Sequence, residues 1–161
     1  MRRRMMIAAS GSAALLLGMA RAQADDSPRA VLEGYLAAWN AHDADAAASY
    51  FAEDVVYYDA SVGRPIQGRA QTKAAVIDNF LNAAPDAVWI VKGEPATEGG
   101  KVVFEWEFSG TNTGAWADGT AATGKAFHFP GASVVEVENG KIKLQSDYYD
   151  ALGFYKQLGL M

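Results

Sequence analysis

The sequence contains no cysteine and only two histidines, His42 and His128. A chain without cysteine has no disulfide, no thiolate metal site and no cysteine nucleophile. The two histidines lie far apart, and no further metal-ligating residues cluster around either one in the sequence. We therefore expect neither a metal site nor another cofactor.

Basic residues are also few. The 161 residues include 14 lysines and arginines against 19 acidic residues, which gives a formal net charge of −5. Nucleic acids and anionic membranes attract clustered positive charge, so this balance argues against both as main partners. The chain is half hydrophobic, and its length suits one globular domain with its own core.

The first 24 residues have the three parts of a signal peptide. Arg2 to Arg4 form a basic start, residues 5–20 are mainly apolar, and Ala22-Gln23-Ala24 is a small-x-small cleavage site. Serine and glycine interrupt the apolar stretch, which is too short for a stable membrane span. We predict cleavage after Ala24, a mature domain at 25–161, and a periplasmic or secreted protein free of the membrane. Export by the general or the twin-arginine route stays open.

Three helices are expected in the first half of the mature chain. Ser27 and Pro28 are an N-cap and a first helical residue. Residues at helical spacing then mark one buried face: Val31, Leu32, Tyr35, Leu36 and Trp39. Asp43 is expected to cap a second, short helix, and a third is expected over 69–84. A strand over 55–59 and a loop over 63–68 separate the last two helices.

Four long strands and a last helix are expected after Pro85. The strands begin near Val88 and cover 102–108, 127–138 and 141–149, with hairpin turns at Gly99-Gly100 and Asn139-Gly140. The second of these strands alternates between aromatic and acidic residues, which places Phe104, Trp106 and Phe108 in the core. We expect an α+β fold: a cone-shaped, curved antiparallel sheet with three N-terminal helices over its concave face and a short C-terminal helix at 151–158.

The motifs in this order resemble the nuclear transport factor 2-like superfamily. The resemblance is carried by Tyr35-Leu-Ala-Ala-Trp-Asn-Ala-His-Asp43, by Phe51-Ala-Glu-Asp-Val-Val-Tyr-Tyr-Asp59, and by Gly68-Arg69. The end of the chain, Glu138-Asn-Gly-Lys-Ile142 followed by Asp147-Tyr-Tyr-Asp-Ala-Leu-Gly153, is similar to the SnoaL-like polyketide cyclase branch. The resemblance implies the cone fold over nearly the whole mature chain, whereas the superfamily includes both enzymes and binding modules.

The resemblance also implies two sets of site residues. The ketosteroid isomerase pattern places a hydrogen-bonding tyrosine at Tyr35, a proton-transfer base at Asp59 and a second oxyanion donor at Ser133, which is not an acid. The cyclase pattern makes Asp147 the acid/base and places a histidine fourteen residues earlier, where Ser133 stands. Which of Asp59 and Asp147 is the base stays open.

The resemblance places Gln145, Asp147 and Tyr149 on the concave side of the last strand. Ile142 and Leu144 then lie on the convex side, and a second subunit would cover them, so we expect a homodimer. The ligand is expected to be a small hydrophobic molecule that contacts seven residues: Ser133, Gln145, Tyr149, Phe104, Trp106, Phe108 and Trp39.

All three candidate catalytic residues also have a structural interpretation. Asp59 could end its strand and cap the following loop, and Asp147 could make a structural hydrogen bond to a neighbouring helix. Tyr35 could be a core tyrosine whose hydroxyl bonds to a carboxylate of the pocket. The hypothesis is an exported enzyme that uses cofactor-free acid/base catalysis to cyclise or isomerise a hydrophobic carbonyl compound. The alternative is a periplasmic binding or sensing module with the same pocket and no chemistry.

Overall fold

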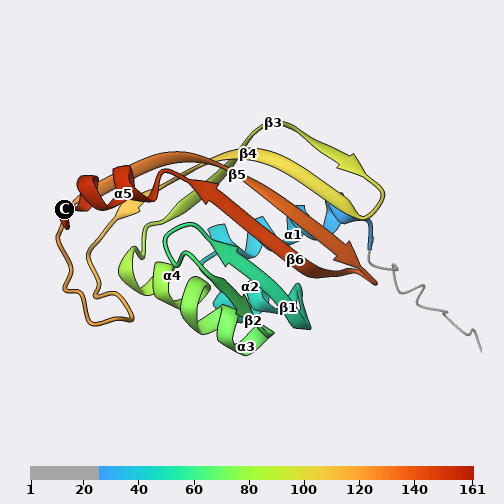
Figure 1. Cartoon of the computed structure of the whole chain (residues 1–161), viewed down its shortest axis with the longest axis horizontal. Coiled ribbons are helices and arrows are strands. Elements are labelled where there is room, and N and C mark those ends of the chain that lie inside the picture. Colours follow the sequence, from blue (N-terminus) through green and yellow to red (C-terminus); the bar gives the residue numbers. More distant parts are fainter. Residues whose placement is uncertain (1–25) are drawn as a thin grey trace, which may run out of the picture.

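A curved six-stranded sheet forms one layer of the protein and helices cover its concave face (Figure 1). This computed structural model describes residues 26–161, so the predicted signal peptide and its cleavage site lie outside the described residues. The spatial strand order is β2-β1-β6-β5-β4-β3. The strands are β1 (Phe51–Asp59), β2 (Pro65–Gln67), β3 (Val88–Glu98), β4 (Lys101–Thr111), β5 (Ala126–Glu138) and β6 (Lys141–Tyr149).

The four long strands β3 to β6 form the predicted antiparallel series. Asn139 and Gly140 both have positive φ, 51° and 70°, as a two-residue hairpin turn between β5 and β6 requires. The remaining pairing differs from the prediction, because β1 runs parallel to β6. The sheet is therefore mixed, and the long chain segment between β1 and β6 supplies the crossover that a parallel pair needs. Residues 65–67, expected within a loop, form β2 and pair with β1.

The predicted helices are present with the predicted caps. They are α1 (Pro28–Asn40), α2 (Ala44–Ser49) and α5 (Ala151–Leu158). Asp43 accepts a hydrogen bond from the Ala46 N–H at 2.9 Å, and Ser27 caps α1 in the same way. The third predicted helix is one run whose middle is π-helical, so it comprises α3 (Arg69–Thr72), η1 (Lys73–Asp78) and α4 (Asn79–Ala83). No helix within residues 26–161 is long and apolar enough to cross a membrane.

The core lies between the concave face of the sheet and the helices. Phe104, Trp106 and Phe108 of β4 are buried, as the alternation predicted, whereas Val103 and Glu105 between them are exposed. The apolar face of α1 packs on the same core and buries Leu32 and Tyr35, among others. The apolar residues recur every second position in β4 and about every 3.6 positions in α1, and both sets are buried in the same core.

The last strand contains a β-bulge that the sequence analysis did not foresee. Val137 pairs with Ile142 and Glu136 with Leu144, so Lys143 is an extra residue in the ladder. On the N-terminal side of the bulge, the side chains of β6 therefore face the opposite way from the way an unbroken strand would place them. As a result Ile142 is fully buried in the core. The prediction that Ile142 lies on the convex face is therefore wrong, while Leu144 is half-buried.

Candidate functional site

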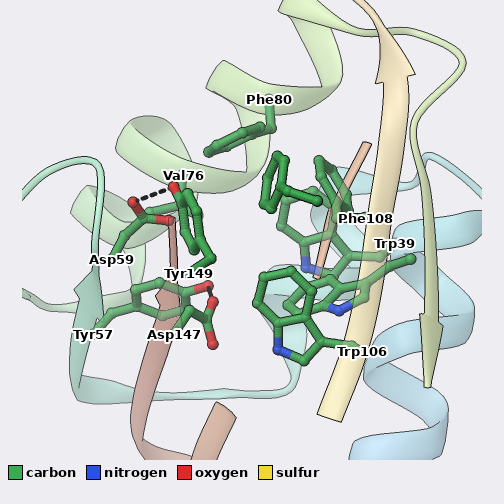
Figure 2. A pocket seen from close by; sticks show the side chains of 11 residues that line it. Trp39, Tyr57, Asp59, Val76, Phe80, Trp106, Phe108, Asp147 and Tyr149 are labelled. Carbon is green, nitrogen blue, oxygen red and sulfur yellow. Dashed lines mark hydrogen bonds between the residues drawn. The ribbon is translucent and has the colours of Figure 1, made fainter. Parts of the chain in front are cut away.

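An aromatic cavity lies between the concave face of the sheet and the helices (Figure 2). Its empty space is about 310 Å³, including the part that opens to solvent. Three indole and three phenyl rings form much of its wall: Trp39, Trp89, Trp106, Phe80, Phe108 and Phe129. Because part of this space is open solvent, the enclosed part of the cavity is small and suits a small molecule rather than a large ring system.

The rings of the wall meet at steep angles. Trp39 and Trp89 are edge-to-face with 5.4 Å between centroids and an interplanar angle of 86°. The Trp89–Trp106 pair has an angle of 76°, and the Trp39–Phe108 pair one of 90°. The edge-to-face arrangement is the one that aromatic quadrupoles prefer, so packing keeps the wall in a defined shape.

The polar groups of the cavity lie on the side opposite this wall. Figure 2 shows Asp59 and Asp147 with Tyr57 and Tyr149 on one side, and Trp106 among the rings of the other. Asp59 ends β1, and its Cα partner in the parallel β1–β6 pair is Asp147. The parallel pairing therefore places two carboxyl groups next to each other at one end of an apolar cavity.

Asp147 is buried, with 4% of its surface exposed, and three side chains donate hydrogen bonds to its carboxyl group. The Ser133 hydroxyl donates to Oδ1 at 2.6 Å and the Gln145 amide at 3.0 Å, while the Tyr57 hydroxyl donates to Oδ2. The donors come from β5, β6 and β1, so the carboxyl group is held from three adjacent strands. Trp106 Nε1 donates to Ser133 Oγ at 2.7 Å and leaves the serine proton for Asp147.

Burial raises the pKa of Asp147 to about 6, and the negative charge of Asp59 adds to the rise. The hydrogen bonds from Ser133, Tyr57 and Gln145 act in the opposite direction because they stabilise the ionised form. Burial also raises the pKa of Tyr57 and of Tyr149, so both phenols stay protonated and act as donors at neutral pH. Asp147 can therefore exchange a proton near neutral pH, whereas the phenols of Tyr57 and Tyr149 keep theirs.

Asp59 has the capping role that its structural interpretation predicted, and it also lines the cavity. Its Oδ1 accepts hydrogen bonds from the Ser61 N–H at 2.7 Å and the Ser61 hydroxyl at 2.5 Å, which fixes the turn after β1. The Tyr149 hydroxyl donates to the same oxygen at 2.8 Å. Asp59 also lines the cavity, and no donor within residues 26–161 reaches its Oδ2. Asp59 is therefore both a structural cap and a carboxyl group available to a ligand.

The predicted residues Trp39, Trp106, Phe108, Tyr149, Asp59 and Asp147 line the cavity. Ser133 and Gln145 do not line the cavity, and their contribution to the site is the hydrogen bonds that they donate to the Asp147 carboxyl group. Phe104 is buried in the core away from the cavity lining.

Tyr35 is also outside the lining, and its buried hydroxyl has no hydrogen-bond partner in the described part of the chain. The expected bond from Tyr35 to a pocket carboxylate is therefore wrong. Tyr57 makes that bond instead, and the sequence analysis missed it. Tyr57 is two residues before Asp59, so strand parity alone could have placed both on one face.

Metal-ligating residues do not gather in this site. Within residues 26–161 no group of three or more His, Asp or Glu side chains is arranged to hold a metal ion. The functional groups of the site are a buried carboxyl group, neutral hydrogen-bond donors and an aromatic wall.

A family model described as SnoaL-like polyketide cyclase matches residues 29–158. A comparison with curated proteins finds no match. Among solved structures, TsrD from Streptomyces laurentii is 25% identical, with a TM-score of 0.69 over 83% of this chain and 95% of that chain.

Two further solved structures are similar in fold. A protein from Jannaschia sp. CCS1 assigned to the SnoaL-like polyketide cyclases is 14% identical, with a TM-score of 0.71 over 89% of this chain and 99% of its own. A protein with a ketosteroid isomerase-like fold from Catenulispora acidiphila, solved in complex with trimethylamine, is 22% identical. Its TM-score is 0.67 over 80% of this chain and 92% of that chain. At these identities the likeness shows the fold alone.

Proposed function

Because the chain belongs to the SnoaL-like polyketide cyclase family, we propose that it catalyses cofactor-free proton transfer on a small carbonyl compound, with Asp147 as the acid/base. One observation carries the proposal: Asp147 is a buried carboxyl group in an aromatic cavity with a pKa of about 6. A general base is most effective when its pKa is near the working pH. We assign the role to Asp147 and not to Asp59 because burial raises the pKa of Asp147, whereas Asp59 also caps the turn after β1 through its Oδ1.

In the proposed step Asp147 takes a proton from the carbon next to the carbonyl. The C–H bond breaks and its electron pair forms an enolate. In an isomerisation the protonated carboxyl group then returns the proton to another carbon. In a cyclisation the enolate carbon bonds to a second carbonyl carbon of the same molecule, and the oxygen of that carbonyl takes the proton from Asp147. The indole N–H groups of Trp39 and Trp89 are buried in the cavity wall and have no hydrogen-bond partner within residues 26–161. They are the donors available to the carbonyl oxygen, since an unpaired buried donor gains most from a ligand acceptor.

The variant Asp147→Asn tests this function. The change keeps the size of the side chain but removes its proton affinity, so turnover of a model enone or β-diketone is expected to fall by roughly two to four orders of magnitude. Asp54→Asn is the matched control, since Asp54 is an exposed carboxylate paired with Lys143 and lies away from the cavity. Unchanged turnover in Asp147→Asn would remove Asp147 from the mechanism.

A binding or sensing module is the second candidate function. Ser133 stands where the cyclase pattern has a histidine, and this substitution favours it. In that case Trp106→Ala abolishes ligand binding, while the Asp→Asn variants at 59 and 147 change no measurable turnover.

Export and dimerisation complete the proposal. Residues 1–24 would direct export to the periplasm or beyond and then be removed. The homodimer would form through the convex face, which exposes four large apolar side chains: Val88, Ile90, Val103 and Tyr148. This face replaces the one predicted around Ile142.

A further inference from the structure

The cavity contains negative charge that the protein does not neutralise. Asp59 and Asp147 are 3% and 4% exposed, and no lysine, arginine or histidine lines the cavity with them. Among the ion pairs of residues 26–161, none includes either carboxyl group. Buried charges in proteins are normally paired with an opposite charge.

The hydrogen bonds to Asp59 come from neutral groups and leave one oxygen available. Ser61, Val62 and Tyr149 all donate to Oδ1. Oδ2 has no donor within residues 26–161, although the side chain is almost completely buried and lines the cavity (Figure 2). A cationic group that enters the cavity would therefore meet an open carboxylate oxygen.

The opposite wall suits the same kind of ligand. An aromatic face carries partial negative charge and attracts a cation, most strongly in the case of tryptophan. Trp39, Trp89 and Trp106 line the cavity, and successive rings meet at 86° and 76°. The three indoles thus pack into one continuous aromatic wall. An ammonium nitrogen with alkyl substituents satisfies both walls, because its methyl groups pack on the rings while its charge interacts with them.

We propose that the ligand of this cavity carries a small alkylated ammonium group, packed against the wall of Trp39, Trp89 and Trp106 and neutralised by Asp59. The inference rests on the proposed function, since it names the ligand class of the same cavity. With the ammonium group at Asp59, the neighbouring strand presents Asp147 to an adjacent part of the same ligand.

Choline and its neutral analogue 3,3-dimethylbutan-1-ol provide the test, because they have the same shape and differ in charge. Binding of each to the full chain would be measured by calorimetry and by the intrinsic tryptophan fluorescence, to which three tryptophans of the cavity and Trp116 contribute. Choline is expected to bind at least about tenfold more tightly, since a desolvated cation gains that much from aromatic faces alone. Asp59→Asn should weaken choline about tenfold or more and leave the neutral analogue within about twofold. Asp54→Asn removes the same charge from an exposed site and should change neither.

The proposal is overturned if the neutral analogue binds as tightly as choline, or if choline does not bind at millimolar concentrations. It is also overturned if Asp54→Asn and Asp59→Asn weaken choline equally. If Asp59→Asn does not fold, the comparison of the two probes on the unmodified protein decides alone. None of these readouts uses turnover, so the loss or survival of catalysis in Asp147→Asn is judged separately.

Discussion

The buried carboxyl group of Asp147 should make the protein less stable at neutral pH than at mildly acidic pH. Its ordinary pKa is near 3.8, and in the folded protein the pKa is about 6. Below pH 4 the group is protonated in both the folded and the unfolded chain, so its ionisation costs nothing. Between pH 4 and 6 the unfolded chain releases this proton while the folded protein keeps it, and the free energy of unfolding falls. Above pH 6 both states are ionised and the loss is complete.

The size of this loss follows from the two pKa values. A pKa difference of about two corresponds to roughly 3 kcal/mol, to order of magnitude, since each pKa unit is worth 1.36 kcal/mol. Asp147→Asn removes the titration. The asparagine oxygen can still accept from Ser133 and Gln145, and its amide can donate to the Tyr57 hydroxyl. The variant should therefore be more stable than the unmodified protein at pH 7, with most of the advantage gone at pH 4.

Urea unfolding of both proteins at several pH values between 4 and 8 measures the effect. The difference between the two free energies of unfolding should change over pH 4 to 6 and be constant above that range. The same series on Asp54→Asn separates the effect of Asp147 from that of an exposed carboxylate on the adjacent strand β1. A difference between Asp147→Asn and the unmodified protein that does not depend on pH would refute an elevated pKa for this carboxyl group.

Three further predictions concern the support of the site, the N-terminus and the assembly. Ser133→Ala removes a donor from the ionised form of Asp147, so the acidic limb of the pH–rate profile should move to higher pH by about one unit; an unmoved limb would mean that the 2.6 Å hydrogen bond has no functional weight. The exported protein should begin at Asp25 on N-terminal sequencing, whereas a soluble form starting at Met1 would count against export. Light scattering should give a dimer that Ile90→Lys converts to a monomer, because that variant places a charge on the exposed apolar face; a monomeric unmodified protein at micromolar concentration would contradict this assembly.

Local sequence patterns determined most of the fold. The Asn139-Gly140 turn, the alternation in β4 and the caps at Ser27 and Asp43 depend on a few neighbouring residues, and each was placed correctly. These patterns could do so because side-chain direction follows the backbone period wherever the period is unbroken. The inner-face positions of Asp147 and Tyr149 came from the family resemblance and not from a local pattern.

The tertiary structure decided what those patterns leave open. The bulge at Lys143 turned Ile142 into the core, because a one-residue insertion in the ladder reverses every side chain on one side of it. The parallel pairing of β1 with β6 joined Tyr57 to Asp147 across 90 residues of sequence and set Asp59 beside it. No local period encodes which distant strand becomes a neighbour, since that depends on how the whole sheet closes over its core. The residue types of the site can be read from the chain, but their convergence into one buried acidic pair facing an aromatic wall exists only in the folded protein.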